Sequence, residues 1–292
     1  MKKFDKHKFN KVLLTSCIVI CVIFGAFLAT AGILYGTINL DIEKLTSINN
    51  GIRVYSSMGE DSTLYNSNKS IVEVDTLPEY VKNAFIDVED KNFYKHHGYD
   101  FKRIVKACLV NLTTHSKSQG ASTISQQLVK NALLSNEKTY RRKIEELVLS
   151  IKMEKKFTKK EIMEMYLNTI YFGSNAYGIE NASTTYFGKQ SKDLTLSEAC
   201  CLAGIIKSPK KYSPKTNLEN AVERRNLVAK SMYNNGHITD DELQEVLNSN
   251  LDVLLGTENE YSYEKEAIYE ACKLLNITER ELINKNYQIV TN

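Results

Sequence analysis

The longest hydrophobic segment of the chain lies close to its beginning. No charged residue occurs from Val12 to Gly36, a run of 25 positions. As a helix this segment is about 38 Å long, against a bilayer hydrocarbon core of about 30 Å. A cleaved signal peptide is the alternative, because Ala29 and Ala31 form an A-x-A pattern of small residues. The apolar region of a signal is usually only about 7–15 residues long, so the pattern favours a retained transmembrane anchor over residues 12–36.

The hydrophobic pattern then changes from short alternation to helical periodicity. Residues 37–75 combine alternating positions with turn residues, which predicts a linker and a short β-hairpin. Pro78 suits the first turn of a helix, and helical periodicity dominates from there to about residue 235. We therefore expect a mainly α fold.

One apolar stripe ends at a pair of acids. Within "AFIDVEDKNFYKHHG" and the residues before it, the stripe is formed by Val81, Ala84, Phe85 and Val88. Helical spacing places Glu89 on the flank of this stripe and points Asp90 the opposite way. A carboxylate at the edge of an apolar surface is partly desolvated, which makes it a better proton acceptor near neutral pH. The alternative is an ordinary solvated helix face.

The segment "YRRKIEELVLSIKMEKKF" at 140–157 predicts a helix that packs on two sides. One stripe contains Ile144, Leu147, Val148 and Ile151, and a second contains Leu149 and Met153. Glu146 lies four residues after Arg142, so the pair forms either a structural ion pair or part of a site. Nine Lys or Arg residues occur between positions 138 and 160. They are either solvated lysines or a region that binds phosphate.

Composition and charge limit the class of protein. With 292 residues, 42% of them hydrophobic and 25% charged, the chain has a globular composition. Its net charge of +3 arises in the first eleven residues, "MKKFDKHKFNK", and the rest is nearly neutral, which argues against nucleic acid as a partner. By the positive-inside rule, residues 1–11 form a cytoplasmic tail and the later domain lies outside the membrane.

Cysteine and histidine spacing does not predict a metal site. Beyond the anchor, the cysteines are Cys108, Cys200, Cys201 and Cys272, without a C-x-x-C pair and each in an apolar helical context. We expect them to be small buried hydrophobic residues. Two adjacent histidines, His96 and His97, do not suit two ligands on one helix face.

Five blocks of the chain share one resemblance. They are "EDKNFYKHHG" at 89–98, "GASTISQQLVKN" at 120–131, "RKIEE" at 142–146, "KKEIMEMYLN" at 159–168 and "YFGSNAYGIENASTTYFGK" at 171–189. In this order they resemble the motifs of the peptidoglycan glycosyltransferases, the transglycosylase domains of class A penicillin-binding proteins and their monofunctional relatives. The resemblance covers about residues 53–235. It implies a lysozyme-like, two-lobed glycosyltransferase domain, which we assign to residues 76–240 behind a single N-terminal transmembrane helix.

The resemblance also implies an activity and its residues. Family members polymerise lipid II into glycan strands outside the cytoplasmic membrane. Glu89 matches the general base and Glu146 the second essential glutamate. The candidates for substrate binding are Ser122, Gln126, Gln127, Lys130, Lys138, Arg142 and Lys143, the cations among them for the pyrophosphate. Gln126 and Gln127 are alternatively buried amides that hold the lobes together. The family often has arginine at the position of Lys138, so phosphate binding there is expected to be weaker.

Seven further matches are interpreted as structural supports. They are Asp90, Phe93, His96 and Gly98 in the loop after Glu89, and Glu164, Tyr166 and Asn168 in the second lobe. The resemblance requires no cofactor and leaves a divalent cation open. It implies lipid II, the growing glycan strand, the cytoplasmic membrane and other cell-wall synthesis proteins as partners.

The C-terminal segment and the rival functions complete the expectations. Residues 241–292 resemble the helical connector that precedes a transpeptidase domain, and since no K-T-G follows, we expect no transpeptidase domain. The rival functions are a membrane-anchored lytic glycosidase and a catalytically idle cell-wall scaffold. A hydrolase does not need the basic region, and an idle scaffold would tolerate loss of Glu89, Glu146 or Lys130, which are all present.

Overall fold

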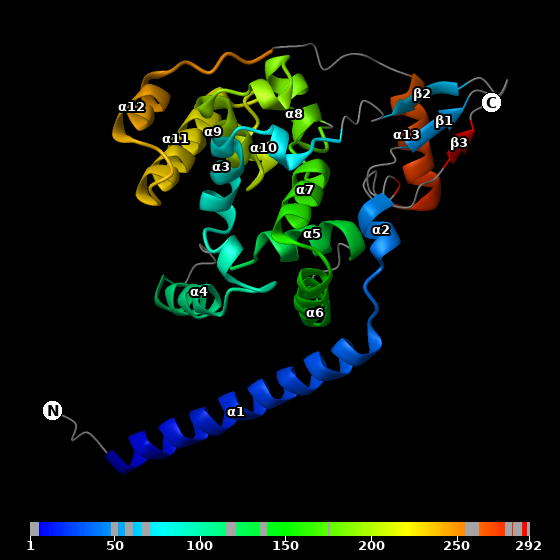
Figure 1. Cartoon of the computed structure of the whole chain (residues 1–292). Coiled ribbons are helices and arrows are strands. Elements are labelled where there is room, and N and C mark those ends of the chain that lie inside the picture. The colour runs from blue at the N-terminus through cyan, green and yellow to red at the C-terminus, as the bar shows by residue number, and fades with distance from the viewer. Residues whose placement is uncertain are drawn as a thin grey trace.

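The computed structural model describes residues 6–47, 52–55, 61–65, 71–114, 121–134, 139–174, 176–254, 263–277, 282 and 288–290. The fold is mainly α, as the sequence predicts (Figure 1). The helices are α1 (Lys6–Thr37), α2 (Ile42–Ser47), α3 (Glu79–Glu89), α4 (Phe101–Thr114), α5 (Ile124–Leu133), α6 (Tyr140–Lys156), α7 (Lys159–Thr169), α8 (Ile179–Phe187), α9 (Leu196–Ile205), α10 (Pro209–Tyr212), α11 (Leu218–Asn234), α12 (Asp240–Asn248) and α13 (Tyr263–Leu275). The strands are β1 (Ile52–Tyr55), β2 (Asp61–Tyr65) and β3 (Gln288–Val290).

Helix α1 contains the apolar segment 12–36 and extends away from the other helices (Figure 1). Within the described part of the chain, no helix is recognised as long and apolar enough to cross a membrane. The C-terminal end of α1 contacts α6, where the ammonium groups of Lys152 and Lys155 lie 4.8 and 5.2 Å from the centre of the Tyr35 ring. Lys152 also donates a hydrogen bond to the Ile38 carbonyl. Helix α6 therefore contacts α1 as well as α5, so the two-sided packing predicted for it is confirmed.

Threonine side chains fix where many of the helices begin. The hydroxyls of Thr123, Thr139, Thr158, Thr195 and Thr239 each accept a hydrogen bond from the backbone N–H three residues later. At α5, α7, α9 and α12, a Gln or Glu side chain at that later position completes a capping box. Each cap stabilises its helix by about 1 kcal/mol, so local sequence sets these helix starts.

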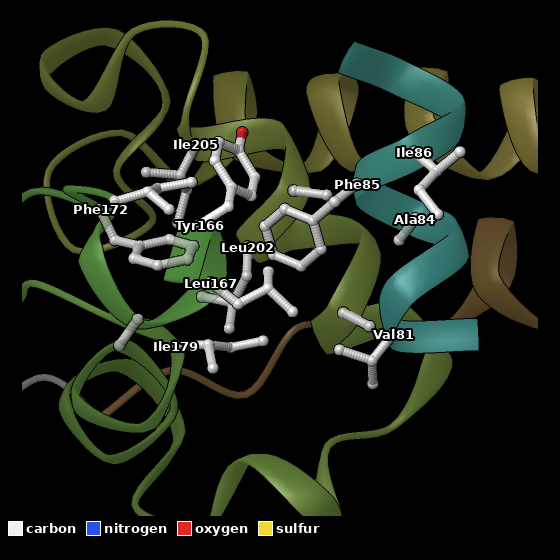
Figure 2. Close-up of a cluster of buried hydrophobic side chains, with 14 of the residues drawn as sticks. Val81, Ala84, Phe85, Ile86, Tyr166, Leu167, Phe172, Ile179, Leu202 and Ile205 are labelled. Carbon is white, nitrogen blue, oxygen red and sulfur yellow. The ribbon is translucent and has the colours of Figure 1, made fainter. Parts of the chain in front are cut away.

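The core lies around α3, which packs against α9 and α11. Val81, Ala84 and Phe85 of the predicted stripe are fully buried, and the Phe85 ring meets Phe172 edge to face at 6.1 Å. Figure 2 shows these side chains together with residues of α7, α8 and α9. Burial of each large apolar side chain contributes about 1.5–3 kcal/mol. The helix that ends at Glu89 is thus held by its apolar face.

A polar cluster also holds the last turn of α3. The Asp87 carboxylate accepts a hydrogen bond from Asn235 Nδ2 at 2.9 Å, and its other oxygen lies 2.6 Å from His237 Nδ1. Ser231 Oγ donates to the Asp87 carbonyl at 2.9 Å. Burial raises the pKa of the Asp87 carboxyl, and the His237 contact opposes that rise. The turn between α11 and α12 is therefore attached to α3 two residues before Glu89.

The three strands form one small sheet in the order β2-β1-β3. Strands β1 and β2 are antiparallel, with Ile52 opposite Tyr65, so the predicted hairpin is confirmed. Strand β3 pairs in parallel with β1, with Val54 opposite Ile289. The expectation of a connector-like helical segment over residues 241–292 did not include β3. A three-residue strand whose partner lies at the other end of the chain leaves too little local pattern to predict.

The prediction that the outer cysteines are buried is confirmed for the two on α9. Cys200 and Cys201 on α9 are free, fully buried thiols, and burial raises the pKa of each to about 12. Cys272 on α13 is only half-buried, so the prediction of burial is wrong there. The side chain of Cys108 lies outside the described residues.

Candidate active site

Glu89 is the last residue of α3 and is half-buried at the edge of the core. Gln127 of α5 donates a hydrogen bond from Nε2 to Glu89 Oε2 at 2.6 Å. The Gln127 Oε1 atom in turn accepts a hydrogen bond of 3.4 Å from the hydroxyl of Tyr166, a fully buried residue of α7. Burial raises the pKa of Tyr166 well above its usual value, and the charges of Glu89 and Asp90 add to the effect. Glu89 thus has an oriented carboxylate with one defined donor.

Asp90 leaves the helix, contrary to the helical placement expected from the sequence. Its φ of −156° and ψ of 69° end α3, and the side chain is 0% exposed. One carboxylate oxygen accepts a hydrogen bond from the Ile124 N–H at 3.0 Å and lies 2.8 Å from His96 Nε2. The other oxygen lies 3.5 Å from an Arg103 nitrogen. Asp90 therefore joins the loop after α3 to the start of α5.

The same loop is fixed on α5 and α6 by Gly98. Its carbonyl accepts hydrogen bonds from Thr123 Oγ1 at 2.8 Å and Ser150 Oγ at 3.1 Å. Its φ is +92°, and a Cβ at this position would lie 2.9 Å from backbone atoms of Ser150 and Ile151. Only glycine fits such a close approach with a positive φ.

Phe93 and His96 fill the space under the loop. Phe93 is fully buried and its ring meets the His96 ring at 6.2 Å. The Lys159 ammonium lies 4.5 Å from the centre of the Phe93 ring and forms an ion pair with Glu154 at 2.6 Å. Together with Gly98, these contacts hold the position of the chain immediately after Glu89.

Glu146 is the centre of a second charged cluster. Glu146 is only 1% exposed, and two cationic side chains of the same helix lie next to its carboxylate. An Arg142 nitrogen lies 3.5 Å from one carboxylate oxygen, and Lys143 forms an ion pair with the other. Lys143 also donates to Ser122 Oγ at 2.8 Å, while half of its side chain remains exposed. One buried carboxylate thus fixes two cations, which leaves a net positive charge at the surface.

The other residues predicted to bind substrate differ in their surroundings. Gln126 is 3% exposed, and its Oε1 accepts a hydrogen bond from the Thr123 N–H in the capping box of α5, which is the structural alternative left open by the sequence. The T-x-x-Q pattern already signals this role. Lys130 is exposed on α5, and Lys138 lies outside the described residues.

Part of the basic region is engaged in ion pairs. Arg141 contacts Glu145 at 2.9 Å, Lys159 contacts Glu154, and Lys160 contacts Asp75. The Lys159 pair joins α7 to α6 and the Lys160 pair joins α7 to the segment before α3, whereas the Arg141 pair lies within α6. The cations beside Glu146 remain the stronger candidates for an anionic ligand.

Two of the predicted supports in α7 attach it to the segment before α3. Glu164 Oε2 accepts a hydrogen bond from the Val74 N–H at 3.0 Å. Asn168 accepts from the Val72 N–H and donates to the Val72 carbonyl, both at 2.9 Å. Tyr166 lies between these two residues in the sequence, but its hydroxyl contacts Gln127 instead.

The arrangement offers a proton acceptor and a cationic cluster on adjoining elements. Glu89 provides the carboxylate, while Arg142 and Lys143 provide positive charge next to Ser122, the residue before the Thr123 cap. Within the described residues, no group of three or more His, Cys, Asp or Glu side chains could hold a metal ion. Proton transfer combined with stabilisation of an anionic leaving group is the chemistry that fits these groups.

Comparisons with known proteins identify the family. The Transglycosylase family matches residues 57–233. Penicillin-binding protein 1A of Aquifex aeolicus is 46% identical over 211 residues, which are 72% of this chain and 28% of that protein. Penicillin-binding protein 1F of Bacillus subtilis is 36% identical over 279 residues, 93% of this chain and 39% of that protein. Penicillin-binding protein 1A of Escherichia coli is 40% identical over 245 residues, 80% of this chain and 28% of that protein.

The chain therefore spans between 28 and 39% of the length of these relatives. The family match covers more than half of the chain and includes Glu89, Gln127 and Glu146. The chain belongs to the transglycosylase family.

Proposed function

We propose that this chain is a peptidoglycan glycosyltransferase that polymerises lipid II into glycan strands. It transfers the MurNAc anomeric carbon of the growing chain to the GlcNAc 4-hydroxyl of lipid II, with inversion, and undecaprenyl pyrophosphate leaves. Membership of the transglycosylase family supports this proposal. The observation that carries it is the half-buried Glu89 carboxylate held by the Gln127 amide.

Glu89 acts as the general base. A sugar hydroxyl is a poor nucleophile until a carboxylate accepts its proton, and such catalysis contributes about 10²–10⁴-fold to the rate. Fixation of the α3 end by Asp87 and Asp90 holds the carboxylate in one place. A fixed base loses less activity to misorientation than a mobile one.

Glu146 organises the cations that receive the leaving group. Negative charge gathers on the pyrophosphate as the glycosidic bond to it breaks, so fixed cations stabilise the transition state more than the bound substrate. Arg142 and Lys143 are already oriented by Glu146, and Ser122 is hydrogen-bonded to Lys143. Lys130 and Lys138 are the further candidates for contact with the pyrophosphate.

The proposal includes a place at the cytoplasmic membrane. Residues 1–11 would remain in the cytoplasm, residues 12–36 would anchor the chain, and the domain would work outside on a lipid-linked substrate. The uncharged length of residues 12–36 supports this topology. Other cell-wall synthesis proteins are the expected partners. No cofactor is required in this proposal, and EDTA treatment tests whether a divalent cation contributes.

The test is incubation of the purified full chain in detergent with lipid II, followed by separation of the products by size. We expect long glycan strands with the wild type and none with Glu89→Gln. Moenomycin, which resembles the donor lipid, should block the wild-type reaction. A lytic glycosidase would instead shorten preformed glycan, and an idle scaffold would leave lipid II unchanged. Either result contradicts the proposal.

A further inference from the structure

The amide of Gln127 lies between two groups that together fix its polarity. Glu89 Oε2 is 2.6 Å from the amide nitrogen, and the Tyr166 hydroxyl is 3.4 Å from the amide oxygen. An ionised carboxylate has no hydrogen to donate, so it faces the amide N–H₂. The amide oxygen then faces Tyr166, whose hydroxyl must be the donor. Each of the three groups has the partner that its chemistry needs.

The surroundings keep Tyr166 in its donor form. The residue is fully buried in α7, and both burial and the nearby charges of Glu89 and Asp90 raise its pKa. Its hydroxyl therefore keeps its proton at neutral pH and can donate to the Gln127 amide oxygen. The two residues on either side that we interpreted as supports, Glu164 and Asn168, contact the backbone of residues 72–74, whereas Tyr166 faces α5.

We propose that Tyr166 is a positioning residue that acts through Gln127, holding the amide with its N–H₂ toward Glu89 so that the carboxylate of the base stays oriented. The inference rests on the proposed role of Glu89 as the base. It gives Gln127 a role beside the base instead of contact with substrate, and it gives Tyr166 a role beyond bracing the second lobe.

A simple bracing role makes a different prediction. Tyr166→Phe keeps the aromatic ring in the core and removes only the hydroxyl. If Tyr166 only braces α7, the loss adds to that of any change at Gln127. If Tyr166 acts through Gln127, Tyr166→Phe causes no further loss of activity in a variant that already lacks the Gln127 amide. The effects of mutations within one hydrogen-bond network are not additive.

The kinetic experiment is a double-mutant cycle in the full chain, with lipid II as substrate. Gln127→Met keeps the length of the side chain without its amide. Gln127→Met loses a hydrogen bond to the Glu89 carboxylate, which predicts a kcat about ten-fold lower. Tyr166→Phe loses a hydrogen bond between two neutral groups, which predicts a kcat about five-fold lower. We expect the double variant to be about ten-fold slower, as Gln127→Met alone, with KM little changed. A loss of about fifty-fold, the product of both, would overturn the proposal.

Tyr186→Phe is the matched control. Tyr186 is also fully buried, but its hydroxyl donates to the Phe172 carbonyl at 2.9 Å, away from Gln127. Its kcat should equal that of the wild type. Equal slowing by Tyr186→Phe and Tyr166→Phe would show that the effect is general to the core and would count against a role through Gln127.

A second measurement does not depend on activity. In full chain labelled with ¹⁵N at glutamine side chains, the Gln127 amide signals are those that disappear in Gln127→Met. They should shift in Glu89→Gln and in Tyr166→Phe, and stay in place in Tyr186→Phe. Unchanged signals in Tyr166→Phe would overturn the proposal. Absence of polymer with the wild type would contradict the proposed function alone, because the NMR signals still report the contact between Tyr166 and Gln127.

Discussion

Replacement of Gly98 by alanine tests how closely the loop after Glu89 approaches α6. The added Cβ would lie 2.9 Å from the Ser150 carbonyl group and from the Ile151 nitrogen. All of these are backbone atoms within a helix, so none can rotate away. The backbone φ of +92° adds a second cost for any residue with a Cβ.

The magnitude follows from these two terms. A left-handed φ costs alanine about 1–2 kcal/mol, and an overlap in a well-packed region costs about 1–3 kcal/mol. The free energy of unfolding should therefore fall by about 2–5 kcal/mol, and Tm by roughly 4–20 °C for a domain of this size. Polymerisation should fall as well, because the Gly98 carbonyl binds Thr123 and Ser150 and so positions the loop that begins at Asp90.

Gly236→Ala separates the two terms. Gly236 has a φ of +78°, but a Cβ added there would have nothing within 4 Å. This variant should lose only the backbone term, about 1–2 kcal/mol. Thermal unfolding of both variants, followed by circular dichroism, gives the comparison. If Gly98→Ala and Gly236→Ala lower Tm equally, the close approach of the loop to α6 is refuted.

Three further predictions concern the charges and thiols. Glu89→Gln should keep the Tm of the wild type and lower polymerisation by at least about 10²–10⁴-fold, and wild-type turnover by this variant would contradict its role as the base. Lys130→Ala and Lys138→Ala should each slow glycan formation without unfolding the domain, and normal polymerisation by both would place the pyrophosphate site elsewhere. Because burial raises the pKa of Cys200 and Cys201 to about 12, iodoacetamide at pH 8 should leave both unmodified in native protein and modify them only in denaturant, as checked by peptide mass mapping.

The sequence predicts most of the helical scaffold because its signals are local. The two stripes of α6 predict that it packs on both sides, and α6 indeed contacts α1 and α5. The apolar stripe of α3 predicts the buried face that includes Val81 and Phe85. Capping boxes such as the one at Thr123 encode helix starts within four residues of sequence.

The features that sequence misses depend on contacts between distant segments. The predicted direction of the Asp90 side chain assumes that the helix continues through this residue. Helix α3 instead ends at Glu89, and the Asp90 side chain is buried. Tyr166 contacts Gln127 across two helices, and β3 pairs with β1 from a distant part of the chain. The local sequence of either partner does not show which distant segment it will meet. Motif resemblance points to Glu89 and Glu146, whereas the partners that orient them emerge only from the packing.

The cluster at Asp87 has a consequence for the order in which the protein matures. Ribosomes release a chain from its N-terminus, so α3 is made long before the turn that supplies Asn235 and His237. Until that turn has been synthesised, the last turn of α3, which carries Glu89, lacks the contacts of Asp87 with Asn235 and His237. A nascent chain stalled just short of residue 235 should hold Glu89 loosely and remain inactive, while one stalled well past residue 254 has every described contact of α3 available. The end of α3 therefore gains its last contacts late in synthesis, from the turn between α11 and α12.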